Sequence, residues 1–152
     1  MNIHYLSDSI IPSRTANSVH VMKMCAAFSA LGHNPVLFTI NTFSSINHIE
    51  NYYEHYNVEN NFAIKKHPKI PFPTRLSKRI YPYVVSIISK NKKVDLAYCR
   101  DLVSCHLCSN LKIPTVFEAH LSISDFGKNK FKIIQNIISN PYVKKIVLIS
   151  NE

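Results

Sequence analysis

Glycine is scarce in this chain of 152 residues, in which it occurs only twice. The backbone therefore has few positions that adopt a positive φ without strain. Neither a Walker-type phosphate loop nor the glycine-rich dinucleotide fingerprint is present. Cysteine occurs four times, and these residues are too few and too scattered for a disulfide framework in a domain of this size.

Long apolar runs are also missing. No stretch approaches the length that spans a bilayer. The first residues, Met1–Tyr5, lack the basic region and the long apolar segment of a signal peptide. We therefore expect a cytoplasmic location. Hydrophobic residues make up 46% of the chain, which suits one compact domain with its own core.

Acidic side chains are few, with 9 Asp and Glu against 18 Lys and Arg, a net charge of +9. The excess is concentrated in residues 60–94, where no acidic residue occurs. Such a block favours an anionic partner, either nucleic acid or an acidic membrane surface, although it also suits a solvated face. We favour peripheral docking at the inner membrane face, and nucleic acid is the weaker alternative. The residues assigned to this face are Lys65, Lys66, Lys69, Arg75, Lys78 and Arg79.

Short apolar segments alternate with segments of helical spacing, a pattern typical of βαβ units with a parallel sheet. The expected strands are 3–7, 35–40, 62–66, 95–100, 115–119 and 145–150. The expected helices are 18–31, 44–56, 76–89, 102–111 and 130–140. Asn17 or Ser18 is expected to cap the first helix and Gly32 to end it. Pro68–Pro73 is expected to form an irregular loop, and Pro82 to kink or shorten its helix.

The corner between the first strand and the first helix is the strongest candidate for a ligand site. Asp8 ends the strand, and the loop that follows contains Arg14, Ala16, Asn17 and Ser18. Strand carboxyl ends and helix amino ends converge at such corners, and free helix N–H groups bind anions. The loop therefore predicts a phosphate or sugar site with Arg14 as a charged clamp, or else a plain capped helix.

Two later strand ends could face the same crevice. Glu118 and His120 follow one strand, where His120 is placed either to donate to a substrate hydroxyl or to pack under the next loop. Arg100 ends another strand, and Asp101 is expected to cap the next helix. Cys105 and Cys108 have the spacing of half a zinc site with no second pair, so we expect them to pack as small hydrophobes and expect no metal.

Several of these segments together resemble a known family. Residues 3–9, Pro12, 16–31, Gly32-His33 and 36–39 resemble the start of a GT-B glycosyltransferase of the large retaining family called glycosyl transferases group 1. Residues 95–100 followed by a helix, the segment from Ile113 to His120 and the terminal 146–150 agree with it. The resemblance covers essentially the whole chain but only the family's N-terminal domain.

The resemblance implies one Rossmann-like, acceptor-side domain over residues 1–152, half of a GT-B architecture. A C-terminal domain, absent here, would bind a nucleotide-sugar donor, so this chain is expected to be inactive or nearly so alone. Ala16 and Asn17, where the family commonly has a glycine pair, would approach the donor diphosphate or the acceptor, and His120 the transferred sugar. The implied acceptor is a saccharide or a lipid-linked sugar, and the resemblance implies no metal or other cofactor. A non-catalytic binding subunit remains the alternative, with a nucleic-acid-binding protein less favoured.

Overall fold

The computed structural model describes residues 1–43, 49–119 and 128–149, and these residues form one open sheet with helices on both faces. All five strand pairings are parallel, in the order β3-β2-β1-β4-β5-β6. The strands are β1 (Asn2–Ile10), β2 (Asn34–Thr42), β3 (Ala63–Phe72), β4 (Leu96–Cys99), β5 (Thr115–Ala119) and β6 (Val143–Leu148).

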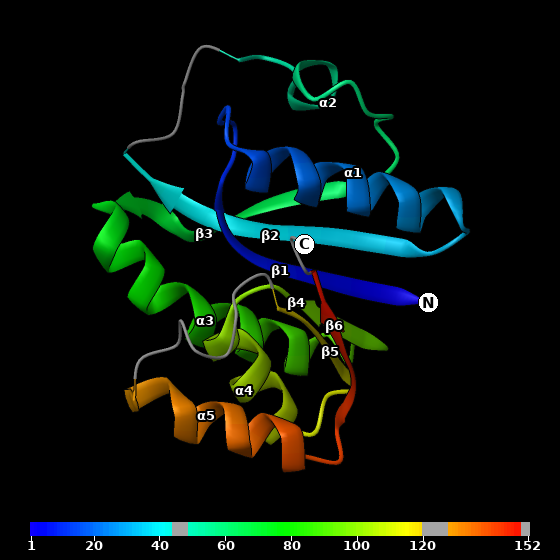
Figure 1. Cartoon of the computed structure of the whole chain (residues 1–152). Helices are drawn as coiled ribbons and strands as arrows, with labels where there is room; N and C mark the ends of the chain where they lie inside the picture. The colour runs from blue at the N-terminus through cyan, green and yellow to red at the C-terminus, as the bar shows by residue number, and fades with distance from the viewer. Residues whose placement is uncertain (44–48, 120–127, 150–152) are drawn as a thin grey trace.

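The helices divide between the two faces of the sheet, as Figure 1 shows. One face carries α1 (Ala16–Ala30) and α2 (Tyr52–His55). The other carries α3 (Thr74–Asn91), α4 (Leu102–Asn110) and α5 (Lys128–Ser139). This is the three-layer, Rossmann-like α/β fold with a parallel sheet that the alternating segments predict.

The two faces of the sheet have separate apolar cores, because side chains alternate along each strand. On the α1 face, Tyr5, Leu37 and Tyr98 pack with Val21 and Cys25 of α1. The other core joins alternate strand residues to α3, α4 and α5, and it includes Leu6, Phe38, Cys99, Phe117, Tyr81, Cys105, Cys108 and Ile137. Cys105 and Cys108 thus pack as small hydrophobes, as expected.

The ends of α1 follow partly from the sequence. Gly32 has φ +79° and closes the helix, with its N–H donating to Ser29 (2.9 Å) and the N–H of His33 donating to Phe28 (3.1 Å). This double bond pattern is the Schellman motif, and it confirms the predicted role of Gly32. The amino-terminal cap, however, is Thr15, whose hydroxyl accepts from the N–H of Ser18, and not Asn17 or Ser18.

Three sequence expectations about the middle of the chain are corrected. Residues 68–72 belong to β3, where proline is tolerated because β3 is an edge strand and needs fewer ladder donors. Pro82 lies inside α3, which continues to Asn91, so this proline does not shorten the helix. The adjacent Tyr81 is fully buried, and its hydroxyl accepts from the N–H of Ser7 and donates to the carbonyl of Phe38. Of the helix expected over 44–56, the described part contains only Tyr52–His55.

Candidate functional site

The strand order places one crevice at the carboxyl edge of the sheet. From β1 the chain moves to β2 on one side, whereas β4 joins β1 on the other. Open α/β sheets bind ligands at this switch point, outside the carboxyl ends of the strands. The loop from β1 to α1, the predicted ligand corner, lies at this edge (Figure 1).

The β1–α1 loop is held in one conformation by buried contacts. The hydroxyl of Tyr56, a buried residue, accepts from the N–H of Ser13 (2.7 Å) and donates to its carbonyl (2.9 Å). The Ser18 hydroxyl donates to the carbonyls of Ser13 (2.9 Å) and Thr15 (2.8 Å). Ser18, predicted as a ligand contact, therefore uses its hydroxyl to hold the loop.

The other predicted loop residues are more accessible. Arg14 and Ala16 are exposed, and Asn17 is half-buried. In the described part of the chain, the backbone N–H groups of Ala16 and Asn17 have no acceptor, whereas the N–H of Ser18 is capped. The loop therefore presents two free N–H donors and a nearby guanidinium, a combination suited to an anion.

Asn17 is held by its side chain from two strands. Its amide nitrogen donates to the Ser9 hydroxyl at the end of β1 (2.8 Å), and its amide oxygen accepts from the Arg100 guanidinium after β4. The Ser9 hydroxyl also bonds to that of Ser7 (2.6 Å). These contacts tie the start of α1 to both strands of the switch point.

A buried ion pair lies beneath this contact. Glu118 at the end of β5 is 1% exposed, and its carboxylate lies 2.8 Å from the Arg100 Nε, with Arg100 7% exposed. The Tyr5 hydroxyl donates to the same carboxylate (3.3 Å). Burial, followed by a hydrogen bond to Glu118, raises the pKa of Tyr98, so this phenol stays protonated. Arg100 and Glu118 thus lie below the crevice and hold its surface residues in place.

His20 is a site residue that the sequence analysis missed. Its Nε2 lies 3.0 Å from the Glu118 carboxylate, and its side chain is 36% exposed. The two atoms lie at ion-pair distance without hydrogen-bond geometry, so the imidazole is placed beside a buried carboxylate, as acid, base and hydrogen-bonding groups of active sites often are. The signal was available, because His20 follows Asn17 by three residues and so shares its helix face.

Two carboxylates flank the crevice on the α3 face. Asp8 pairs with Lys78 of α3 (2.9 Å) and so ties α3 to the end of β1. Asp101 caps α4, accepting from the N–H of Ser104 (2.7 Å), as predicted. Burial raises the pKa of Asp101 to about 6, and the neighbouring Asp8 adds to the rise.

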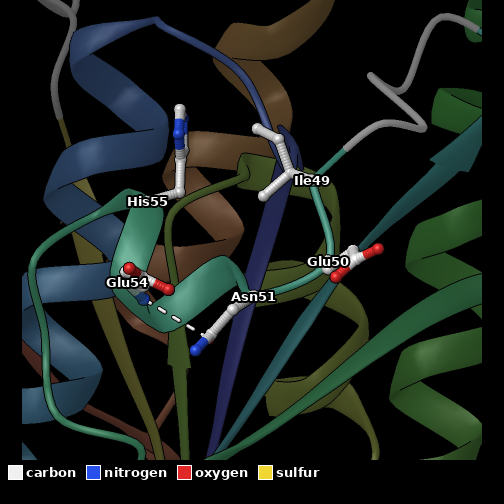
Figure 2. A pocket seen from close by; sticks show the side chains of 5 residues that line it. All are labelled: Ile49, Glu50, Asn51, Glu54 and His55. Carbon is white, nitrogen blue, oxygen red and sulfur yellow. Dashed lines mark hydrogen bonds between the residues drawn. The ribbon is translucent and has the colours of Figure 1, made fainter.

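A second hollow, of about 440 Å³, lies beside α2. Figure 2 shows the side chains that line it, namely Ile49, Glu50, Asn51, Glu54 and His55. Asn51 caps α2, and its side chain accepts from the N–H of Glu54 (3.3 Å). Because Tyr56, at the end of α2, holds Ser13, this acidic hollow adjoins the β1–α1 loop. Carboxylates disfavour a phosphate there but accept from sugar hydroxyls.

The predicted basic face is divided by the structure. Lys78 is paired with Asp8, and Lys66 lies over the Tyr52 ring and donates to its hydroxyl (3.0 Å). Four residues are exposed and have no ion-pair partner within the described ranges: Lys65, Lys69, Arg75 and Arg79. Large exposed apolar side chains lie in the same segments, namely Phe43 after β2, Ile70 in β3 and Leu76 in α3. This mixed basic and apolar surface adjoins the carboxyl edge.

His120, predicted to be catalytic, lies outside the described residues. Across residues 1–43, 49–119 and 128–149, no three metal-ligating side chains gather in one group. No helix within those ranges is both long and apolar enough to span a membrane.

Comparison with known proteins identifies the fold. No family model matches the chain, and no curated protein matches it in sequence. Among solved structures, Acinetobacter baumannii MurG aligns over 99% of this chain with a TM-score of 0.57 and 10% identity. The lipopolysaccharide outer core galactosyltransferase WaaB, in its apo form, aligns over 96% with a TM-score of 0.57 and 12% identity. The chain spans 42% and 38% of their lengths, so its fold is that of one half of these GT-B glycosyltransferases.

Proposed function

We propose that this chain is the N-terminal, acceptor-side domain of a retaining glycosyltransferase. The enzyme would transfer a sugar from a nucleotide-sugar donor to a saccharide or lipid-linked acceptor in polysaccharide or glycolipid assembly. The observation that carries the proposal is the switch-point site, which combines two free N–H donors with the oriented His20. The structural similarity to two GT-B glycosyltransferases, of which this chain spans 42% and 38%, supports it.

The site residues divide into those that touch ligands and those that position them. The N–H groups of Ala16 and Asn17, with Arg14, would contact the donor diphosphate. His20 and His120 would contact the sugar or the attacking hydroxyl. Arg100 and Glu118 are positioning residues, because one holds Asn17 and the other holds His20.

A second domain is needed to complete this site. The switch-point site presents one surface, and the donor would lie between that surface and a donor-binding domain in the same or another chain. The acidic hollow beside α2 suits the acceptor, since hydroxyl groups donate to the carboxylates of Glu50 and Glu54. No metal is required, because helix N–H groups and Arg14 supply the positive potential.

Docking at an acidic membrane would bring the cleft to a lipid-linked acceptor. Lys69, Arg75 and Arg79 supply charge, and Phe43 and Ile70 supply apolar surface beside the same edge. Anionic lipids attract such a mixed surface, and each exposed basic residue contributes about 1 kcal/mol.

Site-resolved binding tests the ligand assignment on the chain itself. Backbone amide NMR spectra are recorded while UDP-galactose, or UDP alone, is added. We expect the largest shifts at the amides of Ala16 and Asn17, with smaller ones near His20. In the control variant Lys23→Ser, an exposed α1 position, the same shifts persist. Shifts that avoid the first turn of α1 would refute the assignment.

A further inference from the structure

A second basic site lies at the opposite, amino-terminal edge of the sheet. A hollow of about 260 Å³ opens there between the ends of α3 and α4. Three lysines, Lys90, Lys93 and Lys112, line it around an apolar floor of Val94, Ile113 and Pro114, with no acidic side chain in the lining. We call it the lysine hollow.

Two of these lysines have an unusual backbone. Lys93 has φ +50° and Lys112 has φ +62°, in the left-handed region that glycine adopts most readily. Each directly follows the C-cap residue of its helix, at the position that Gly32 occupies after α1. Among the described residues, these are the only lysines with a positive φ, and both line the same hollow.

Glycine at positions 93 and 112 would allow the same backbone hydrogen bonds. The N–H groups of Lys93 and Val94 donate to Lys90 and Ser89, and those of Lys112 and Ile113 donate to Ser109 and Cys108. This is the bonding pattern by which Gly32 closes α1, and it needs no side chain. The two lysine side chains therefore stand at these positions at a conformational cost that ending the helices does not explain.

The positive charge of the three lysines exceeds the negative partial charge of the two helix ends. Each helix carboxyl end carries roughly −0.5 of a charge, so two ends and three ammonium groups leave roughly +2. Lys90 already donates to the carbonyl of Leu111 at 2.9 Å. The neighbouring carboxylate, Asp95, accepts from the N–H of Asn2 at 2.7 Å, and Lys92 adds a further exposed positive charge. Lys93 and Lys112 have no ion-pair partner within the described ranges.

We propose that the lysine hollow binds a soluble, phosphate-bearing anion, with the ammonium groups of Lys93 and Lys112 as its direct ligands. A phosphate dianion matches the excess charge, and lysine binds phosphate as a compact point charge. The volume holds a diphosphate or a phosphorylated small molecule. This site is separate from the switch-point crevice, and it does not depend on the proposed glycosyl transfer.

The test compares the wild-type chain with K93G/K112G, using sodium diphosphate at low ionic strength. Amide NMR shifts of Val94 and Ile113 give both the location and the dissociation constant. We expect the variant to bind at least about tenfold more weakly, because two charge-assisted contacts are lost. The variant should unfold at the same or a higher temperature, since glycine relieves both positive φ values, so a folding defect does not mimic the result.

A matched control removes two lysines elsewhere. K23S/K132S has the same net charge as K93G/K112G, changes exposed positions of α1 and α5, and should keep wild-type affinity in the hollow. Equal diphosphate binding by wild type and K93G/K112G would overturn the proposal. In a second arm with phosphatidylglycerol vesicles, wild type and K93G/K112G should bind alike. Loss of vesicle binding alone would also overturn it, by assigning the hollow to a lipid surface.

Discussion

The buried carboxylate of Glu118 is the most informative position to perturb. Glu118→Gln keeps the side-chain shape but removes the charge that faces Arg100 at 2.8 Å and His20 at 3.0 Å. Because Arg100 is only 7% exposed, water cannot replace the lost partner. Leaving one member of a buried ion pair uncompensated costs about 3–5 kcal/mol. For a domain of this length, that lowers the unfolding midpoint by about 6–20 °C.

Urea denaturation followed by circular dichroism measures this loss. Glu59→Gln is the control, since Glu59 is exposed, and its change should stay within about 0.5 kcal/mol. Arg100→Met should also destabilise, but the double variant should lose less than the sum of the two, by at least about 1 kcal/mol. A loss below about 1 kcal/mol for Glu118→Gln, or strict additivity, would refute the buried-pair reasoning.

Three further predictions concern stability and surface binding. Burial lowers the pKa of His4 to about 4, with Lys65 and Lys92 adding to the shift, so the fold binds this proton less readily than the unfolded chain does. The free energy of unfolding should therefore fall by up to about 3 kcal/mol as pH drops from about 6.5 to about 4. In His4→Gln, the urea midpoint should depend less on pH over that range. Gly32→Ala should lower the free energy of unfolding by about 1 kcal/mol in the same assay, because φ is +79° at this position. No atom lies within 4 Å of the added Cβ, so the loss comes from the backbone alone, and an unchanged urea midpoint would contradict this. Reversing charge in K69E/R75E/R79E should weaken cosedimentation with phosphatidylglycerol vesicles by about a hundredfold or more, whereas unchanged binding would remove the membrane surface.

The layered fold could be predicted because its signals are local. Each strand is a short apolar segment, and each helix carries its own spacing and end signals, such as Gly32 after α1. The errors came where tertiary context decides. Residues 68–72 read as a loop because of their prolines, yet the edge position of β3 removes the need for those N–H groups.

Only part of the candidate site could be predicted from the sequence. The β1–α1 corner could be predicted, because a strand, a polar loop and a helix start follow one another in the chain. The contact of Glu118 with His20 and Arg100 could not, because it joins three elements, and Glu118 of β5 is almost 100 positions from His20 of α1. The sequence also did not show which polar residues are buried: Ser18 was predicted as a ligand contact, yet its hydroxyl bonds within the loop.

Sugar transfer is the most direct test of the central claim. The chain is fused to, or co-expressed with, a donor-binding GT-B domain, and transfer from a panel of radiolabelled UDP-sugars to saccharide and lipid-linked acceptors is measured. The account predicts product from the wild type and a loss of about tenfold or more in both His20→Ala and His120→Ala, with Lys23→Ser unaffected. Transfer at the wild-type rate by both histidine variants would contradict it.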